Sequence, residues 1–166
     1  MSQINVNTIA LANGTEQARL VQVVNVMDGA VATGTTQMPR DNTIPQNTEG
    51  DQYMSLAITP THASNKLLIQ VVVQCTSTIV GTLQAALFKD STAGALAATQ
   101  AKSADSAAEM PLVLNHYMTT GGTSAITFKV RLGVNGSNTT TFNGAASAGY
   151  YGGVSSSSIT ISEIRV

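Results

Sequence analysis

The clearest pattern in the chain is a strict alternation of apolar and other side chains over residues 125–134. Apolar residues occupy every second position from Ile126 to Val134, with Thr, Lys, Arg and Gly between them. A period of two is typical of a β-strand with one buried face. Similar short runs recur along most of the chain between clusters of Gly, Asn, Ser and Thr, and no amphipathic helix stands out. The pattern therefore predicts an all-β protein.

The alternating runs, separated by turn signals such as Asp28-Gly29 and Asn135-Gly136, predict eight to ten strands. Stretches rich in Pro, Gly, Ala or Ser predict loops at residues 37–52, 101–109 and 144–153. The predicted strands span residues 19–27, 30–36, 54–58, 66–78, 82–90, 96–101, 112–119, 125–134, 139–142 and 158–166.

The run at residues 66–78 indicates more than one sheet. One of its faces is wholly apolar and the other is mixed, as in a strand covered on both sides by a second sheet or a second subunit. Burying one strand's apolar side gains about as much free energy as ordering its backbone costs, so the apolar faces must meet a second layer. Strands joined by long crossing loops favour a jelly roll over a meander. We therefore expect an antiparallel β-sandwich of jelly-roll type at residues 19–166, preceded by a short N-terminal arm at residues 1–18.

Composition predicts that this sandwich is an oligomer. The 166 residues fit one domain, and charged residues make up 10% of them, against roughly 25% in typical soluble domains. Many small uncharged side chains and few charged ones are typical of surfaces that meet other protein surfaces. With no Trp and 4% aromatic residues, the core is expected to be aliphatic.

Charge and cysteine usage exclude several classes of partner. The eight Lys and Arg residues form no basic stripe, so nucleic acid is not an expected partner. No apolar run is long enough to span a bilayer and the start is not a secretory signal, so membrane insertion is not expected either. The single cysteine, Cys75, excludes an intrachain disulfide and is predicted to be a small buried strand residue.

Candidate metal ligands and catalytic groups are sparse, so neither a cofactor nor an enzymatic activity is expected. His62 and His116 share no ligand spacing and are expected to be structural or exposed, although His116 on a threefold axis would bring three imidazoles together. Asp41, Glu49 and Asp51 form the one acidic cluster, without the spacing of a calcium loop, and are expected to lie in a solvated loop. A polysaccharide depolymerase, the remote alternative, would need paired carboxylates facing one cleft.

Tyr150 and Tyr151 are candidate contact residues. They lie in the Gly-rich stretch at residues 144–153 of a chain with few aromatics. A tyrosine offers a flat apolar face and a polar tip, which suits recognition of sugars or protein surfaces. Contact with a host receptor and packing at a subunit interface both remain open for this pair.

Several segments resemble a C-terminal domain common in tail-fibre and related virion proteins of tailed bacteriophages. The start of the chain, where Ile4, Val6 and Ile9 alternate with polar residues before Gly14, is similar to the N-termini of phage fibre proteins. The resemblance covers about 135 residues and implies a trimeric β-sandwich knob displayed on a virion. It rests on residues 32–59, 86–90, 121–131, 141–144 and 152–163.

The resemblance leads us to expect a virion structural protein, made in the host cytoplasm and carried on the virion surface. The first hypothesis is a homotrimeric short tail fibre or spike, held to other virion proteins by an arm with Ile4, Val6 and Ile9, that attaches to a host-surface glycan or protein. The alternative is a capsid decoration protein, a cement or head-fibre protein on the head. About 15 residues separate Gly14 from the matching domain. This leaves no room for a shaft and favours decoration, whereas the fibre-like N-terminus favours the tail.

Overall fold

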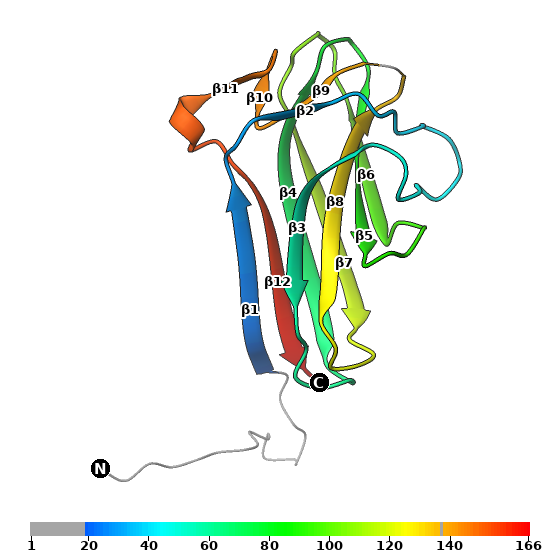
Figure 1. Cartoon of the computed structure of the whole chain (residues 1–166), viewed down its shortest axis with the longest axis vertical. Helices are drawn as coiled ribbons and strands as arrows, with labels where there is room; N and C mark the ends of the chain where they lie inside the picture. Colours follow the sequence, from blue (N-terminus) through cyan, green and yellow to red (C-terminus); the bar gives the residue numbers. More distant parts are fainter. Residues whose placement is uncertain (1–18, 137) are drawn as a thin grey trace.

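The computed structural model of the chain describes residues 19–136 and 138–166. Within them, twelve β-strands and one 3₁₀ turn build a sandwich of two antiparallel sheets and a small hairpin (Figure 1). Between β2 and β9 the chain crosses repeatedly from one sheet to the other, which is the winding of a jelly roll. The prediction of an all-β antiparallel sandwich of jelly-roll type is confirmed. The predicted arm at residues 1–18, with Ile4, Val6 and Ile9, lies outside the described residues.

The first sheet, sheet I, holds six strands. Four long strands run side by side in the order β1-β12-β4-β7, and the short strands β9 and β2 extend the sheet at one end of β4. The strands of sheet I are β1 (Arg19–Asp28), β2 (Ala32–Gly34), β4 (Lys66–Ser77), β7 (Met110–Thr119), β9 (Thr140–Phe142) and β12 (Ser157–Arg165).

The second sheet, sheet II, holds four strands in the order β3-β8-β5-β6. Both inner strands of this order are almost wholly buried or half-buried, as expected where layers cover them. The strands of sheet II are β3 (Asp51–Ile58), β5 (Thr82–Lys89), β6 (Ala97–Lys102) and β8 (Ile126–Val134).

The core lies between the two sheets and consists of the inward members of each alternating run. On β4, Leu67, Ile69, Val71 and Val73 are fully buried, while their neighbours in sequence point away from the core. The core is mainly aliphatic, as predicted. The composition did not indicate, however, that all three phenylalanines would be fully buried. Phe128 and Phe142 lie in this core, whereas Phe88 belongs to a second, smaller cluster.

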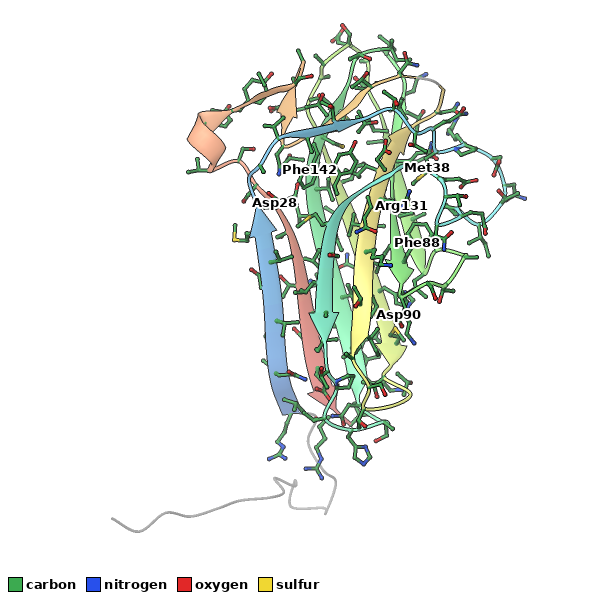
Figure 2. All side chains as sticks on the ribbon, viewed as in Figure 1. Asp28, Met38, Phe88, Asp90, Arg131 and Phe142 are labelled. Atoms are coloured by element: carbon green, nitrogen blue, oxygen red, sulfur yellow. The ribbon has the colours of Figure 1, made fainter. Side chains whose placement is uncertain are left out.

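The long segment between β2 and β3 is an ordered loop, as predicted, and it is fixed over the outer side of sheet II. Met38 is fully buried there against Ala86 and Phe88. Arg131 of β8 donates hydrogen bonds from Nε to the carbonyl of Glu49 (2.9 Å) and from Nη2 to that of Gly50 (2.6 Å). Met38, Arg131 and Phe88 lie near one another on the right of Figure 2. The loop is therefore a second, smaller layer with its own apolar anchor.

Two sequence predictions about local structure were wrong. The strand expected at residues 30–36 spans only Ala32–Gly34, because only these three residues pair with β9. The expected loop at residues 144–153 contains a hairpin of β10 (Gly144–Ala145) and β11 (Ala148–Gly149), followed by the 3₁₀ turn η1 (Tyr151–Gly153). Strands of two residues leave no alternation in a sequence to be recognised.

Replacing Met38 by alanine is expected to loosen the loop selectively. Removing a fully buried methionine side chain costs about 2–5 kcal/mol of unfolding free energy, because a cavity is left where the atoms were. Urea unfolding measures this loss, and amide hydrogen exchange should speed up at residues 37–50 more than in the sheets. As a control, Ile44→Ala in the same loop, where the side chain is 63% exposed, should change stability by less than about 0.5 kcal/mol.

Candidate functional site

The molecule has two distinct ends. β1 begins and β12 ends at the lower end in Figure 1, close to the C-terminus. β10, β11 and η1 lie at the opposite, upper end. The point where residues 1–18 join the sandwich is therefore separated from the tyrosine-bearing segment by the length of sheet I.

Tyr150 and Tyr151 project from the upper end. Tyr150 is 38% exposed and Tyr151 is 77% exposed, and their ring centres are 6.2 Å apart with the planes tilted by 50°. The neighbouring Gly152 and Gly153 have positive φ angles, which glycine adopts without a steric cost, and this turns the chain sharply after the rings. The pair thus offers two solvent-exposed aromatic faces to a partner.

The base of this segment is firmly held. Asn143 donates from Nδ2 to the carbonyls of Asp28 (2.6 Å) and Ala30 (3.0 Å), and Ser157 Oγ donates to Asn143 Oδ1 (2.7 Å). The amide of Gln74 in turn donates to Ser157 Oγ (3.0 Å). Asn143 and Ser157 are buried, so these hydrogen bonds are shielded from water and fix where β10, β11 and η1 leave sheet I.

The outer face of sheet I carries no charged side chain over most of its length. The cross-strand registers of β1, β12, β4 and β7 place one set of alternating residues on the side away from the core. We call this set the uncharged face. It comprises Val23, Asn25, Met27, Leu68, Gln70, Val72, Gln74, Pro111, Val113, Asn115, Tyr117, Ser158, Thr160, Ser162 and Ile164.

Several apolar side chains on the uncharged face are exposed to solvent. Met27 is 67% exposed, Tyr117 54% and Val113 51%, and Val72 lies directly opposite Val113. Four strands at a spacing of about 4.8 Å and seven residues at about 3.3 Å make a face roughly 20 Å by 23 Å. A continuous surface of this size that mixes apolar residues with small hydroxyl and amide groups is typical of a protein–protein contact.

The outer side of sheet II has a different character. Lys102, Lys129 and Arg131 all occupy its outward positions, and the loop at residues 35–50 covers much of β5. Lys129 Nζ donates to the carbonyl of Asp90 (2.8 Å). In the described strands of sheet I the cationic side chains are confined to the lower end, where Arg19, Lys66 and Arg165 lie, whereas sheet II carries cations on its outward face.

A buried carboxylate joins three segments at the lower end. Glu163 of β12 is fully buried, and its Oε1 accepts from the Thr61 amide and hydroxyl (both 2.8 Å) and from Asn65 Nδ2 (2.6 Å). Its Oε2 accepts from Gln22 Nε2 of β1 (2.6 Å). The four donors saturate the carboxylate, so Glu163 links β1, β12 and the β3–β4 turn.

The hydrogen bonds to Glu163 keep it ionised. Burial raises the pKa of this carboxyl, but the donors from Asn65, Gln22 and Thr61 favour the charged form and outweigh burial, which lowers the pKa to about 2. Sequence reasoning missed this residue. The signal was present, because Glu163 falls on the same side of the alternating run as the buried Ile159 and Ile161.

The histidines and the cysteine occupy unrelated places. His62 is exposed in the β3–β4 turn, where Nδ1 contacts Ser64 Oγ at 2.9 Å. His116 pairs with Ile69 and faces the inner side of sheet I, and burial lowers its pKa. This orientation points its imidazole away from any axis that would run along the uncharged face. Cys75 is buried as predicted, and burial raises its pKa to about 12.

The acidic residues of the loop serve local structure. Asp41 Oδ1 accepts from the Thr43 amide and hydroxyl, and these bonds lower its pKa. Glu49 accepts from the Gln46 amide (2.9 Å), and Asp51 accepts from Thr36. Among residues 19–136 and 138–166, no three His, Cys, Asp or Glu side chains come close enough together to hold a metal ion. In the same residues, no helix has the length and apolar character needed to cross a membrane.

Comparisons with known proteins match the fold at low identity. No family model and no curated protein matches the sequence. Eiger TNF from S. frugiperda is similar in structure with a TM-score of 0.46 and 8% identity, over 87% of this chain and 93% of that one. The carbohydrate-binding module CBM36 in complex with calcium and xylotriose has a TM-score of 0.34 and 13% identity, over 86% of this chain and 98% of that one. The VP2 subviral particle of infectious bursal disease virus has a TM-score of 0.39 and 11% identity, over 97% of this chain and 44% of VP2.

Glu163→Gln is expected to lower the free energy of unfolding by about 1–3 kcal/mol at neutral pH. A glutamine amide presents one oxygen and an NH2 group to four donors, so at least one buried donor loses its acceptor. The folded pKa of about 2 lies below the ordinary value of 4.5, so the wild-type contribution is complete above about pH 5 and declines as pH falls toward 2. Urea unfolding between pH 7 and pH 2 measures both effects. The same substitution at the exposed Glu109 is the control, and a loss there of equal size would contradict the assignment.

Proposed function

We propose that this protein is a bacteriophage virion structural protein that works as a homotrimeric short tail fibre or spike and helps the particle attach to its host. Its action is binding, without catalysis. The observation that carries the proposal is the uncharged face, because a broad surface of this kind on a chain with 10% charged residues favours burial against sister copies. The trimeric state and the location on a virion are proposed from the sequence resemblance to phage fibre domains.

Sister copies suit the uncharged face better than an unrelated partner does. A face without charge sets no requirement for opposite charges on the other side, and its serine, threonine, asparagine and glutamine side chains both donate and accept hydrogen bonds. Such a surface can therefore meet a different patch of a neighbouring copy without charge matching, as the head-to-tail contacts of a closed trimer require. The charged outer side of sheet II would then remain in solvent.

The polarity of the molecule supports attachment. Residues 1–18 join the sandwich at the lower end and are proposed to bind other virion proteins through Ile4, Val6 and Ile9. Tyr150 and Tyr151 at the opposite end are then turned away from the particle, where they would contact a host-surface glycan or protein. Three chains on each spike and many spikes on each particle would add weak contacts through effective concentration.

The oligomer is tested with a charge on the uncharged face. Light scattering of the wild-type protein at micromolar concentration should give three times the 17.1 kDa mass of one chain. Val113→Glu should give a monomer, because burying an unpaired carboxylate between copies costs several kcal/mol. Val113 is 51% exposed in the single chain, so the variant should retain the wild-type circular dichroism spectrum.

Ser55→Glu is the matched control for this experiment. Ser55 is an exposed strand residue on the outer side of sheet II, and the new carboxylate would lie opposite Lys129. A trimer for Ser55→Glu and a monomer for Val113→Glu would support the uncharged face as the contact. A monomeric wild-type protein, or trimers from both variants, would contradict it.

The location on the particle distinguishes the fibre from a decoration protein. Gold-labelled antibodies against the purified protein should bind intact phage particles at the tail in electron micrographs. Label confined to the head would overturn the tail-fibre proposal and would favour the capsid decoration alternative. Particles from a host that also expresses a chain without residues 1–18 should not incorporate that shortened chain, because the proposed anchor is missing.

A further inference from the structure

A polar pocket lies between the loop at residues 35–50 and the outer side of β5 and β6. It has a volume of about 460 Å³, within the range of small-molecule sites. We call it the loop pocket. Its polar lining consists of Arg40, Asp41, Thr43, Gln84, Thr99 and Gln100.

Hydrogen bonds between the loop and sheet II hold the walls of the loop pocket together. Gln84 Nε2 donates to the Met38 carbonyl (2.5 Å), Arg40 Nε donates to Gln100 Oε1 (2.9 Å), and the Ala95 amide donates to the Pro45 carbonyl (2.9 Å). The buried side chain of Met38 holds the same loop from below. Loops this long without secondary structure are uncommon in compact domains and usually serve a function. A wall fixed in this way loses little entropy when a ligand binds.

The free hydrogen-bonding atoms of the loop pocket fit hydroxyl groups. Within the described residues, Arg40 uses only Nε and Asp41 uses only Oδ1, which leaves both terminal nitrogens of Arg40 as donors and Oδ2 of Asp41 as an acceptor. An anion would use donors and a cation would use acceptors, whereas a sugar hydroxyl uses both. Arg40 and Asp41 also cancel in charge. The side chains of Pro39, Pro45 and Ala98 add apolar surface for the C–H face of a sugar ring.

A second hollow of about 440 Å³ adjoins the loop pocket on the other side of Thr43 and Pro45. Ile44 and Leu96 line it, so its surface is more apolar than that of the loop pocket. Two neighbouring depressions with shared walls suit a ligand longer than one ring. Both lie on the sheet II side of the sandwich, so they stay open when copies meet through the uncharged face.

We propose that the loop pocket binds a neutral, hydroxyl-rich sugar unit of a host-surface glycan, with Arg40, Asp41 and Gln100 as the contacting groups. The inference rests on the proposed attachment function and adds to it a ligand class and a site distinct from Tyr150 and Tyr151. The pocket contains no aromatic ring for stacking, so a single sugar should bind in the millimolar range. The particle would gain useful affinity from many copies.

Saturation-transfer NMR on the full-length protein tests the pocket, with glucose, galactose, mannose and N-acetylglucosamine as probes at tens of millimolar. At least one sugar should receive saturation from the protein. Arg40→Ala should weaken that binding about tenfold, the loss of one hydrogen bond to a charged group. Ala98→Phe should abolish it by filling the pocket, and it removes none of the hydrogen bonds that hold the loop.

Two control variants locate the binding. Lys102 lies on β6 outside the pocket, so the Lys102→Ala variant should bind sugar as the wild type does. Tyr151→Ala should also bind normally. The proposed sugar site is wrong if none of the four sugars receives saturation. It is also wrong if binding is lost in Tyr151→Ala and kept in Ala98→Phe. Both results are independent of antibody labelling. If the protein is found on the head and still binds a sugar, the tail-fibre proposal is wrong and the proposed sugar site in the loop pocket stands.

Discussion

The interlocking of inward aliphatic side chains between the two sheets is the interaction on which the rest of the structure depends. Each long strand contributes one buried row, and neither sheet could hide its row without the other. Because the side-chain period is two, a slip of one residue in any ladder would turn a buried row toward water. The core therefore fixes which residues reach the surface, including the full composition of the uncharged face.

The two outer surfaces of the sandwich differ in the side chains that they expose. Above the cations at its lower end, sheet I presents small uncharged and apolar groups, whereas sheet II presents cations on its outward face and supports an anchored loop. A single sandwich needs no such division for its own stability, because both outer faces lie in water. The division is consistent with a molecule that joins copies of itself on one side and keeps the other side for solvent or ligand.

Alternation made the long strands predictable. Strands expected at residues 66–78 and 125–134 appear at Lys66–Ser77 and Ile126–Val134, because their apolar faces are clear and their ends carry turn residues. The ordered loop at residues 37–52 was also expected. What the pattern could not supply was the anchor of that loop, since an isolated Met38 among polar residues shows no periodicity.

The candidate sites were harder to predict, because they depend on contacts between distant segments. Tyr150 and Tyr151 were singled out by the rarity of aromatic residues in the chain, and both are exposed. The loop pocket joins Arg40 to Gln100 across 60 residues, a pairing with no local signal. Glu163 could have been found, because the alternation already places it on the inward side, but a charged residue near a strand end is usually taken to be exposed.

The orientation of β1 has a mechanical consequence for a protein held at one end. If residues 1–18 fasten the chain to a particle and the far end grips a cell, tension enters at Arg19 and runs along the strand axis. The hydrogen bonds between β1 and β12 lie across that axis, so the pull shears the whole ladder at once instead of opening it pair by pair. Glu163, bonded to both Gln22 and the β3–β4 turn, spreads the same load into neighbouring strands.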